Sequence, residues 1–364
     1  MIKFKNRSLV FLFIVPVLVG FIILPRNESS NFESRFKKCS EEGTSRLRMS
    51  CFEKVFAKDF ETKGQKWLLN ELEEVQVKDD NSKQSGITKC HDAAHSIGMI
   101  AGMTTTNVQE SFSNCTNTCG FGCHMGVIEG YFHTHTDSLK EFPEICKKSS
   151  HVYSCVHAVG HYIAHLTGNL ERSLSTCDLI QEVEYRGHCT SGVFMEIFEQ
   201  PIHSDTSIGF PQDITKLCNS LHDIHKSFCF TMSGFYEYLR TSDLEKGISM
   251  CKSSPEKEIC FMNFSKALYY RENGSEDAMY DFCKSIPSSY LSDCQSGVVD
   301  AAALSDPLAR HGFLFCNLYE GVSRDYCFNT LGNFIEGTHE SEEVRKKLCD
   351  NIPQEDKNSC LRRE

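Results

Sequence analysis

Histidine and glutamate residues gather in one part of this chain. Nine of its fifteen histidines lie between positions 91 and 165. Four consecutive segments that each begin with a cysteine carry most of the relevant residues: "CHDAAHSIG" from Cys90, "CHMGVIEGYF" from Cys123, "CVHAVGHYIAH" from Cys155 and "CTSGVFMEIF" from Cys189. Histidines four residues apart, such as His91 with His95 and His157 with His161, would share one face of a helix.

These side chains have the chemistry of a transition-metal site. If the four segments stack as parallel helices, their imidazoles and carboxylates converge on one surface and form a ligand set for a divalent ion. The candidate ligands are His91, His95, His124, Glu129, His157, His161 and Glu196. The five histidines are expected to bind directly, and the two glutamates to act as further ligands or proton-transfer groups. Zn, Cu or Fe is the expected cofactor, and no catalytic residue is assigned.

Two other interpretations of the histidines stay open. In one, the histidines are polar groups on a partly buried face, satisfied by backbone carbonyls and by one another. In the other, the metal site has an open coordination position and the protein is a metal-dependent oxidoreductase or hydrolase. Known motifs do not decide this, because "HDAAH" lacks the glutamate of H-E-x-x-H and "CGFGCH" is one residue longer than the haem attachment motif C-x2-C-H.

The elements that must position these residues are indicated by the cysteines. The chain has twenty. Eighteen fall in couples 8 to 12 residues apart: 39/51, 115/123, 146/155, 177/189, 218/229, 251/260, 283/294, 316/327 and 349/360. From Cys115 onward the first members recur after 31, 31, 41, 33, 32, 33 and 33 residues. A period of this length predicts a solenoid of repeated supersecondary units.

Within each period the apolar residues recur at helical spacing, as in "CFTMSGFYEYLRTSDLEKGISMC". A first helix should start at the second cysteine of a couple, and a second helix should end at the first cysteine of the next couple. The predicted fold class is therefore all-α, a disulfide-stapled solenoid of antiparallel helical hairpins with a repeat of ~32–33 residues. Each disulfide would remove roughly 2.5 to 3 kcal/mol of unfolded-state entropy.

Two details complete this expectation. Glycine falls three residues after a cysteine at Gly126, Gly192 and Gly297, although an interior helical glycine costs about 1 kcal/mol relative to alanine. Its repetition predicts that neighbouring first helices approach closely. Cys90 and Cys119 lie outside the couples, and by parity we expect them to pair.

The segments "TSDLEKGISMC" and "NGSEDAMYDFC", at 241–251 and 273–283, resemble Sel1-like and tetratricopeptide repeats of the secreted cysteine-rich kind. The resemblance covers about residues 90 to 364. It implies an array that binds partners on a concave face. The alternative to a metal protein is accordingly a metal-free scaffold that binds a protein or peptide of the cell envelope.

The N-terminus predicts export. Lys3, Lys5 and Arg7 precede an unbroken apolar run of seventeen residues from Leu9 to Pro25, close to the shortest run that spans a bilayer. We expect a single-pass signal-anchor with the rest of the chain extracytoplasmic. A cleaved signal peptide, which would leave a secreted protein, is the alternative. The cysteine content agrees with an oxidising compartment. A net charge of -11 argues against nucleic acid as a partner.

The sequence thus divides into five parts. They are a membrane segment at 1–30, capping helices at 31–89, His-rich repeats with the metal site at 90–200, a loop insertion at 201–213 and C-terminal repeats at 214–364. The oligomeric state and the identity of any substrate or partner are not indicated.

Overall fold

The structure is a computed structural model. It describes residues 28–350 except 79–85, 117–118, 150, 204–211, 273, 306–308 and 339–341, together with 352, 354 and 357. Within these residues every regular element is helical, and there is no strand. The all-α fold class is confirmed for this part of the chain.

The helices alternate between long and short. Their bounds are α1 Glu28–Ser40, α2 Ser45–Lys63, α3 Gln65–Lys78, α4 Gly86–Thr104, α5 Val108–Ser113, α6 Gly122–Thr134, η2 Thr136–Glu141, α7 Phe142–Lys147, α8 Val152–Thr167, α9 Leu170–Cys177, α10 Val183–His203, α11 Ile214–Ser220, α12 Asp223–Thr241, α13 Leu244–Ser253, α14 Lys257–Arg271, α15 Glu276–Ser285, η3 Ser288–Tyr290, α16 Leu291–Ser305, α17 Arg310–Cys316, α18 Gly321–Thr338 and α19 Glu342–Cys349. From α4 onward, each even-numbered long helix up to α18 is the first helix of a hairpin, and the short odd-numbered helix after it is the second.

Local chemistry explains the hairpin turns. Gly168 ends α8 in a left-handed conformation, and the side chain of Asn169 then caps α9 by accepting a hydrogen bond from the amide of Arg172. Asp243 caps α13 in the same way. The second helices α9, α17 and α19 end at the cysteine, as predicted. The first helices begin earlier than predicted; α8, for example, starts at Val152 rather than at Cys155.

The disulfide pairing follows the predicted couples. Nine disulfides join described residues, and their Cα atoms lie 5.3 to 5.7 Å apart. Cys90 pairs with Cys119, as parity required. The expected partner of Cys349, Cys360, lies outside the described residues. A helical repeat whose consecutive units are joined by disulfides is therefore confirmed.

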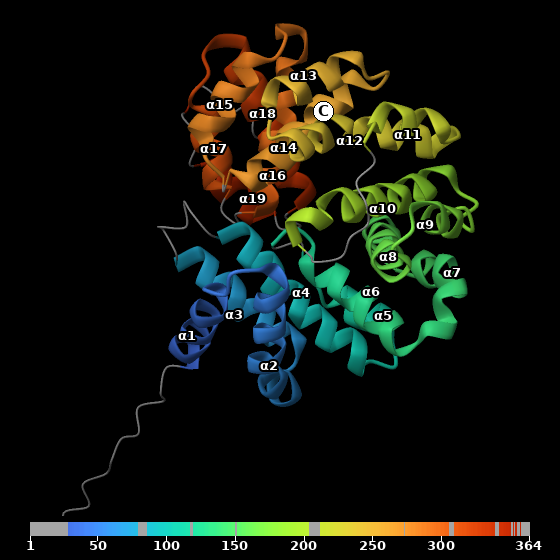
Figure 1. Ribbon diagram of the computed structural model, residues 1–364. Coiled ribbons are helices and arrows are strands. Elements are labelled where there is room, and N and C mark those ends of the chain that lie inside the picture. Colours follow the sequence, from blue (N-terminus) through green and yellow to red (C-terminus); the bar gives the residue numbers. More distant parts are fainter. Residues whose placement is uncertain are drawn as a thin grey trace, which may run out of the picture.

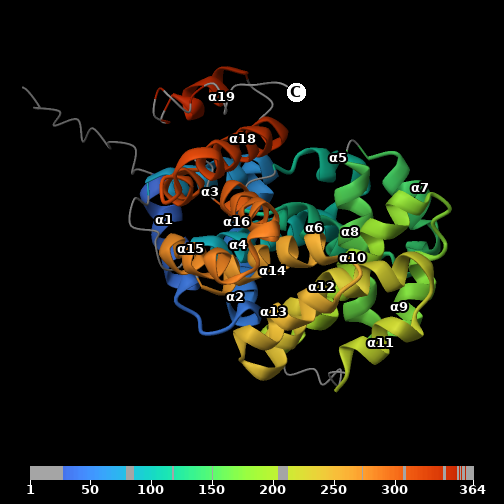
Figure 2. The ribbon, with the colours of Figure 1, turned by 90° about the horizontal axis from the view of Figure 1, so that it is seen from above.

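The first helices pack side by side in chain order, α4 on α6, α6 on α8 and so on to α18. Figures 1 and 2 show that the array curves back on itself, with the short helices at the periphery. Hydrogen bonds between described residues join the two sides of this ring where it closes. The amide of Gly120 donates to the carbonyl of Leu304 at 3.1 Å, and Arg310 donates to the carbonyl of Gln76 at 3.3 Å.

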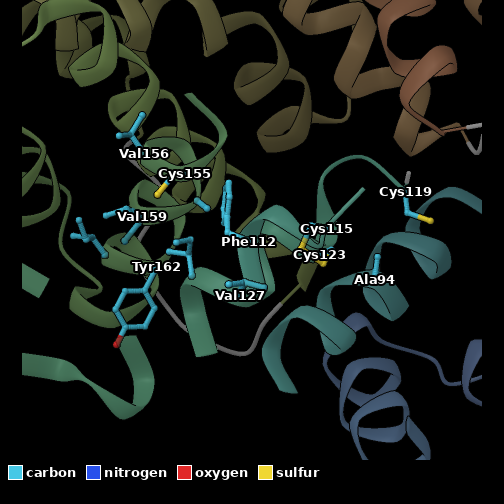
Figure 3. Packing of buried hydrophobic residues seen from close by; sticks show 14 of the residues in the cluster. Ala94, Phe112, Cys115, Cys119, Cys123, Val127, Cys155, Val156, Val159 and Tyr162 are labelled. Atoms are coloured by element: carbon cyan, nitrogen blue, oxygen red, sulfur yellow. A yellow bond between two sulfur atoms is a disulfide. The ribbon is translucent and has the colours of Figure 1, made fainter. Parts of the chain in front are cut away.

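The buried apolar residues form two cores. The first runs from Phe32 to Tyr236 and includes the packing of Phe112, Val127 and Tyr162 shown in Figure 3. The second runs from Phe235 to Ile352. The two cores adjoin within α12, since Tyr236 belongs to one and Phe235 to the other.

Two expectations fall partly or wholly outside the described residues. The predicted membrane segment, 1–30, is described only from residue 28. Among the helices that are described, none has both the length and the apolar character needed to cross a bilayer. The expected loop insertion at 201–213 begins later than foreseen, because α10 continues to His203; residues 204–211 are not described.

Candidate functional site

Glycine brings the histidine-bearing helices into backbone contact. A Cβ atom built on Gly126 of α6 would lie 1.9 Å from the carbonyl oxygen of His95 on α4. A Cβ atom on Gly192 of α10 would lie 2.1 Å from the carbonyl oxygen of His157 on α8. The two helix pairs therefore repeat one arrangement, in which a glycine of one helix rests on the backbone of a histidine of the other. The predicted close approach is confirmed at both positions.

In the pair of α8 and α10, the side chains form a hydrogen-bonded chain. His161 Nδ1 lies 3.2 Å from Glu196 Oε2, and His161 Nε2 lies 3.2 Å from His157 Nε2. The chain ends where His157 Nδ1 donates to the carbonyl oxygen of His188 at 3.2 Å. His165 Nδ1 lies 3.6 Å from the other oxygen of Glu196.

The charge of this row of hydrogen-bonded side chains follows from a count of its protons. The carbonyl of His188 can only accept, so His157 Nδ1 carries a proton and His157 Nε2 accepts from His161. One further proton lies between His161 and Glu196. Three protons shared by one carboxyl group and two imidazoles make the group of His157, His161 and Glu196 neutral overall. The hydrogen bonds within this group are therefore complete without a metal ion.

Burial and neighbouring charges set the protonation of these groups. Burial, followed by the charge of His161, holds the pKa of His157 well below its ordinary value. Burial raises the pKa of Glu196, but hydrogen bonds from His161 and His165 outweigh it, so the carboxyl titrates below its usual range.

In the pair of α4 and α6, the histidines are also engaged. His95 Nε2 lies 3.0 Å from Glu129 Oε2, and His91 Nδ1 donates to the carbonyl of Cys119 at 3.0 Å. Burial and the neighbouring His95 lower the pKa of His91 to about 4. For His95 burial lowers the pKa, but Glu129 raises it further, so the net shift is upward.

His124 stands apart from the other candidates. It is fully buried, with its ring against Phe112, Phe121 and His151 at centroid distances of 4.6, 5.7 and 5.4 Å. Neither ring nitrogen finds a hydrogen-bond partner among the residues that the structure describes. Burial lowers the pKa of His124 to about 3, so it is a neutral component of the core.

The predicted metal site is wrong. Among the residues that the structure describes, no group of three or more His, Cys, Asp or Glu side chains could hold a metal ion. The physical reason is that His157 and His161 use their nitrogens on the carbonyl of His188, on Glu196 and on each other. His95 pairs with Glu129, and His124 is enclosed in the core. The expected Zn, Cu or Fe cofactor is wrong for the same reason, and the described cysteines are held in disulfides.

The two helix pairs nevertheless belong to one cluster. Glu129 of α6 interacts electrostatically with His165 and Glu196, His91 with His161, and Lys266 of α14 with His157. Lys266 in turn forms an ion pair with Asp300 of α16. Glu53 of α2 interacts electrostatically with His95 and Glu129. We call this set the inner polar cluster: Glu53, His91, His95, Glu129, His157, His161, His165, Glu196, Lys266 and Asp300.

Sequence reasoning missed Glu53, His165, Lys266 and Asp300. A signal was present for two of them. Glu129, His161, Lys266 and Asp300 each lie six residues after the cysteine of their first helix, so the repeat places them at equivalent positions of the array. Because α14 and α16 contain no histidine, a pattern built on histidine and glutamate does not include them.

No family model, curated protein or solved structure matches this chain. The geometry of the inner polar cluster is therefore the basis on which its function is inferred.

Proposed function

We propose that the protein is a metal-free extracytoplasmic scaffold that binds a protein or peptide of the cell envelope on the inner face of its first helices. The observation that carries this proposal is the position of ionisable groups six residues after the cysteine on α6, α8, α14 and α16. These positions form two neighbouring pairs of repeats, separated by α10 and α12, which carry Met195 and Phe235 there. An extended chain could contact both pairs. The resemblance of 241–251 to Sel1-like repeats supports the same kind of use.

The exposure of these groups agrees with a binding role. In each histidine–glutamate pair the imidazole lies deeper: the side chains of His95 and His161 are 9% and 10% exposed, whereas those of Glu129 and Glu196 are 28% and 26% exposed. The imidazoles thus hold the carboxylates in place at the surface. Lys266, with 31% exposure, adds a cation on the other half of the ring. A peptide with both acidic and basic groups is the ligand that this face favours.

A binding experiment tests the proposal. Peptides selected from a random displayed library on the full-length protein should lose affinity at least about tenfold, or 1.4 kcal/mol, in Glu129→Gln and in Lys266→Gln. Lys147→Gln is the matched control, because Lys147 lies outside the cluster and pairs with Glu182 on the surface. Equal affinities of all three variants, measured by titration calorimetry, would exclude the inner face as the binding surface.

We further propose that residues 1–30 anchor the protein in the membrane, as the cations at 3, 5 and 7 and the run from Leu9 to Pro25 suggest. The disulfides themselves indicate an oxidising, extracytoplasmic environment. The full chain should stay with membranes after an alkaline carbonate wash, and a variant whose anchor is replaced by a cleavable signal should not. Release of both proteins would contradict the anchor.

A further inference from the structure

The disulfide between Cys90 and Cys119 differs from the others in what it joins. The other eight among the described residues link cysteines 8 to 12 residues apart, at the junction of one helix with the next. Cys90–Cys119 spans 29 residues and ties the start of α4 to the loop before α6. Figure 3 shows Cys119 next to Ala94 of α4, apart from Cys115 and Cys123.

The loop held by this disulfide has an unusual backbone. Cys119, Gly120 and Phe121 are all left-handed, with φ angles of 61°, 63° and 61°. This conformation is unfavourable for the two residues that have a Cβ atom, and it persists only where the surroundings impose it. The disulfide is one such restraint, and the hydrogen bond from His91 to the carbonyl of Cys119 is another.

The same loop closes the ring. The amide of Gly120 donates to the carbonyl of Leu304, near the end of α16. Cys119 of this loop belongs to the first hydrophobic core and buried apolar residues of α16 belong to the second, and these two cores adjoin within α12. Apolar burial supplies most of the cohesion between packed parts of a protein. The contact between this loop and α16 involves two different cores, so it depends on its polar interactions.

We propose that Cys90–Cys119 is a covalent clasp that closes the ring around the inner polar cluster. It holds residues 119–121 in the left-handed conformation that aims the Gly120 amide at α16. Without the disulfide the loop relaxes toward right-handed backbone, the amide turns away from Leu304, and the two halves move apart about α12. The consequence for binding rests on the proposed function, since Glu129 and Lys266 then no longer face one partner together.

The test uses the full-length protein with Cys90 and Cys119 both replaced by serine. Hydrogen exchange at the Gly120 amide, corrected for the intrinsic rate, should accelerate at least tenfold, and the radius of gyration from small-angle scattering should rise. The amides of α8 and α10 should keep their protection. The matched control replaces Cys146 and Cys155 by serine; it should lower the melting temperature but leave the Gly120 amide protected.

Unchanged Gly120 exchange and an unchanged radius of gyration in the Cys90/Cys119 variant would overturn the proposal. If that variant does not fold, Gly120→Pro decides between the outcomes. Proline removes the N–H that donates to Leu304 and holds φ at about −65°, outside the left-handed region, while both cysteines are kept. An unchanged radius of gyration in Gly120→Pro also overturns the clasp. Peptide affinity separates the two claims: an opened ring that binds the selected peptides as tightly as before supports the clasp and contradicts the proposed binding face.

Discussion

Replacing Gly126 by leucine is expected to force α4 and α6 apart and to destabilise the N-terminal half of the protein. A Cβ atom at this position already meets the carbonyl oxygen of His95 at 1.9 Å and the amide of Met99 at 2.7 Å. Both are backbone atoms of a neighbouring helix, so no side chain can move aside. Overpacking within a core costs about 1 to 3 kcal/mol, and we expect at least the upper end here, measured by urea unfolding.

Gly43 provides the control for this substitution. A Cβ atom there meets nothing within 4 Å, and the residue is exposed. Gly43→Leu should therefore change the unfolding free energy by no more than about 0.5 kcal/mol. Gly192→Leu should repeat the large loss on α10, where the carbonyl of His157 lies 2.1 Å from the added atom. Similar stabilities of the Gly126 and Gly43 variants would show that the helices are not in backbone contact.

Acid is expected to destabilise the protein between pH 6.5 and about 4. The folded state keeps His124 neutral down to about pH 3 and His91 down to about pH 4, whereas in the unfolded chain both take up a proton near pH 6.5. The unfolded state therefore binds more protons in this window, and the unfolding free energy falls as the pH falls. For the fully buried His124 alone the loss is roughly 2 kcal/mol at pH 5.

Other groups modify this profile. His95 and His165 have raised pKa values because of their glutamate partners, so their contribution is present at low pH and is lost as the pH rises through those values. His124→Leu isolates the contribution of His124 to the pH dependence of stability, because it removes the titrating ring and fills the same apolar site. Thermal unfolding from pH 7 to 5 should be flatter in this variant than in the parent. A slope equal to that of the parent would show that His124 is protonated in the folded state.

Most of the fold could be predicted from the sequence because the cysteines recur at the junctions between consecutive hairpins. Their spacing predicted the length of the hairpin, and parity predicted the pairing of Cys90 with Cys119. The glycines at positions 126 and 192 indicated the close contacts of their helices. Closure of the ring could not be predicted, because it depends on the small rotation between consecutive hairpins and on a contact between Gly120 and Leu304, which are far apart in the chain.

The structure brings some of the candidate residues together. His161 lies 3.2 Å from Glu196, and His95 lies 3.0 Å from Glu129. The sequence did not show how their nitrogens are used, because a pattern of residue types does not reveal hydrogen-bond partners. His161 uses one nitrogen on Glu196 and the other on His157, so neither is left for a metal. The prediction for His124 was wrong because the residue after the cysteine of α6 points into the hydrophobic core, against Phe112.

The most direct test of the account is to locate a bound peptide on the protein. A photo-reactive amino acid is placed at position 165, whose side chain is 57% exposed beside Glu196, and in a second protein at position 147, outside the cluster. The selected peptides should form a covalent adduct with the full-length protein from position 165, and excess unlabelled peptide should suppress it. Adducts from position 147 with none from position 165 would contradict binding on the inner face.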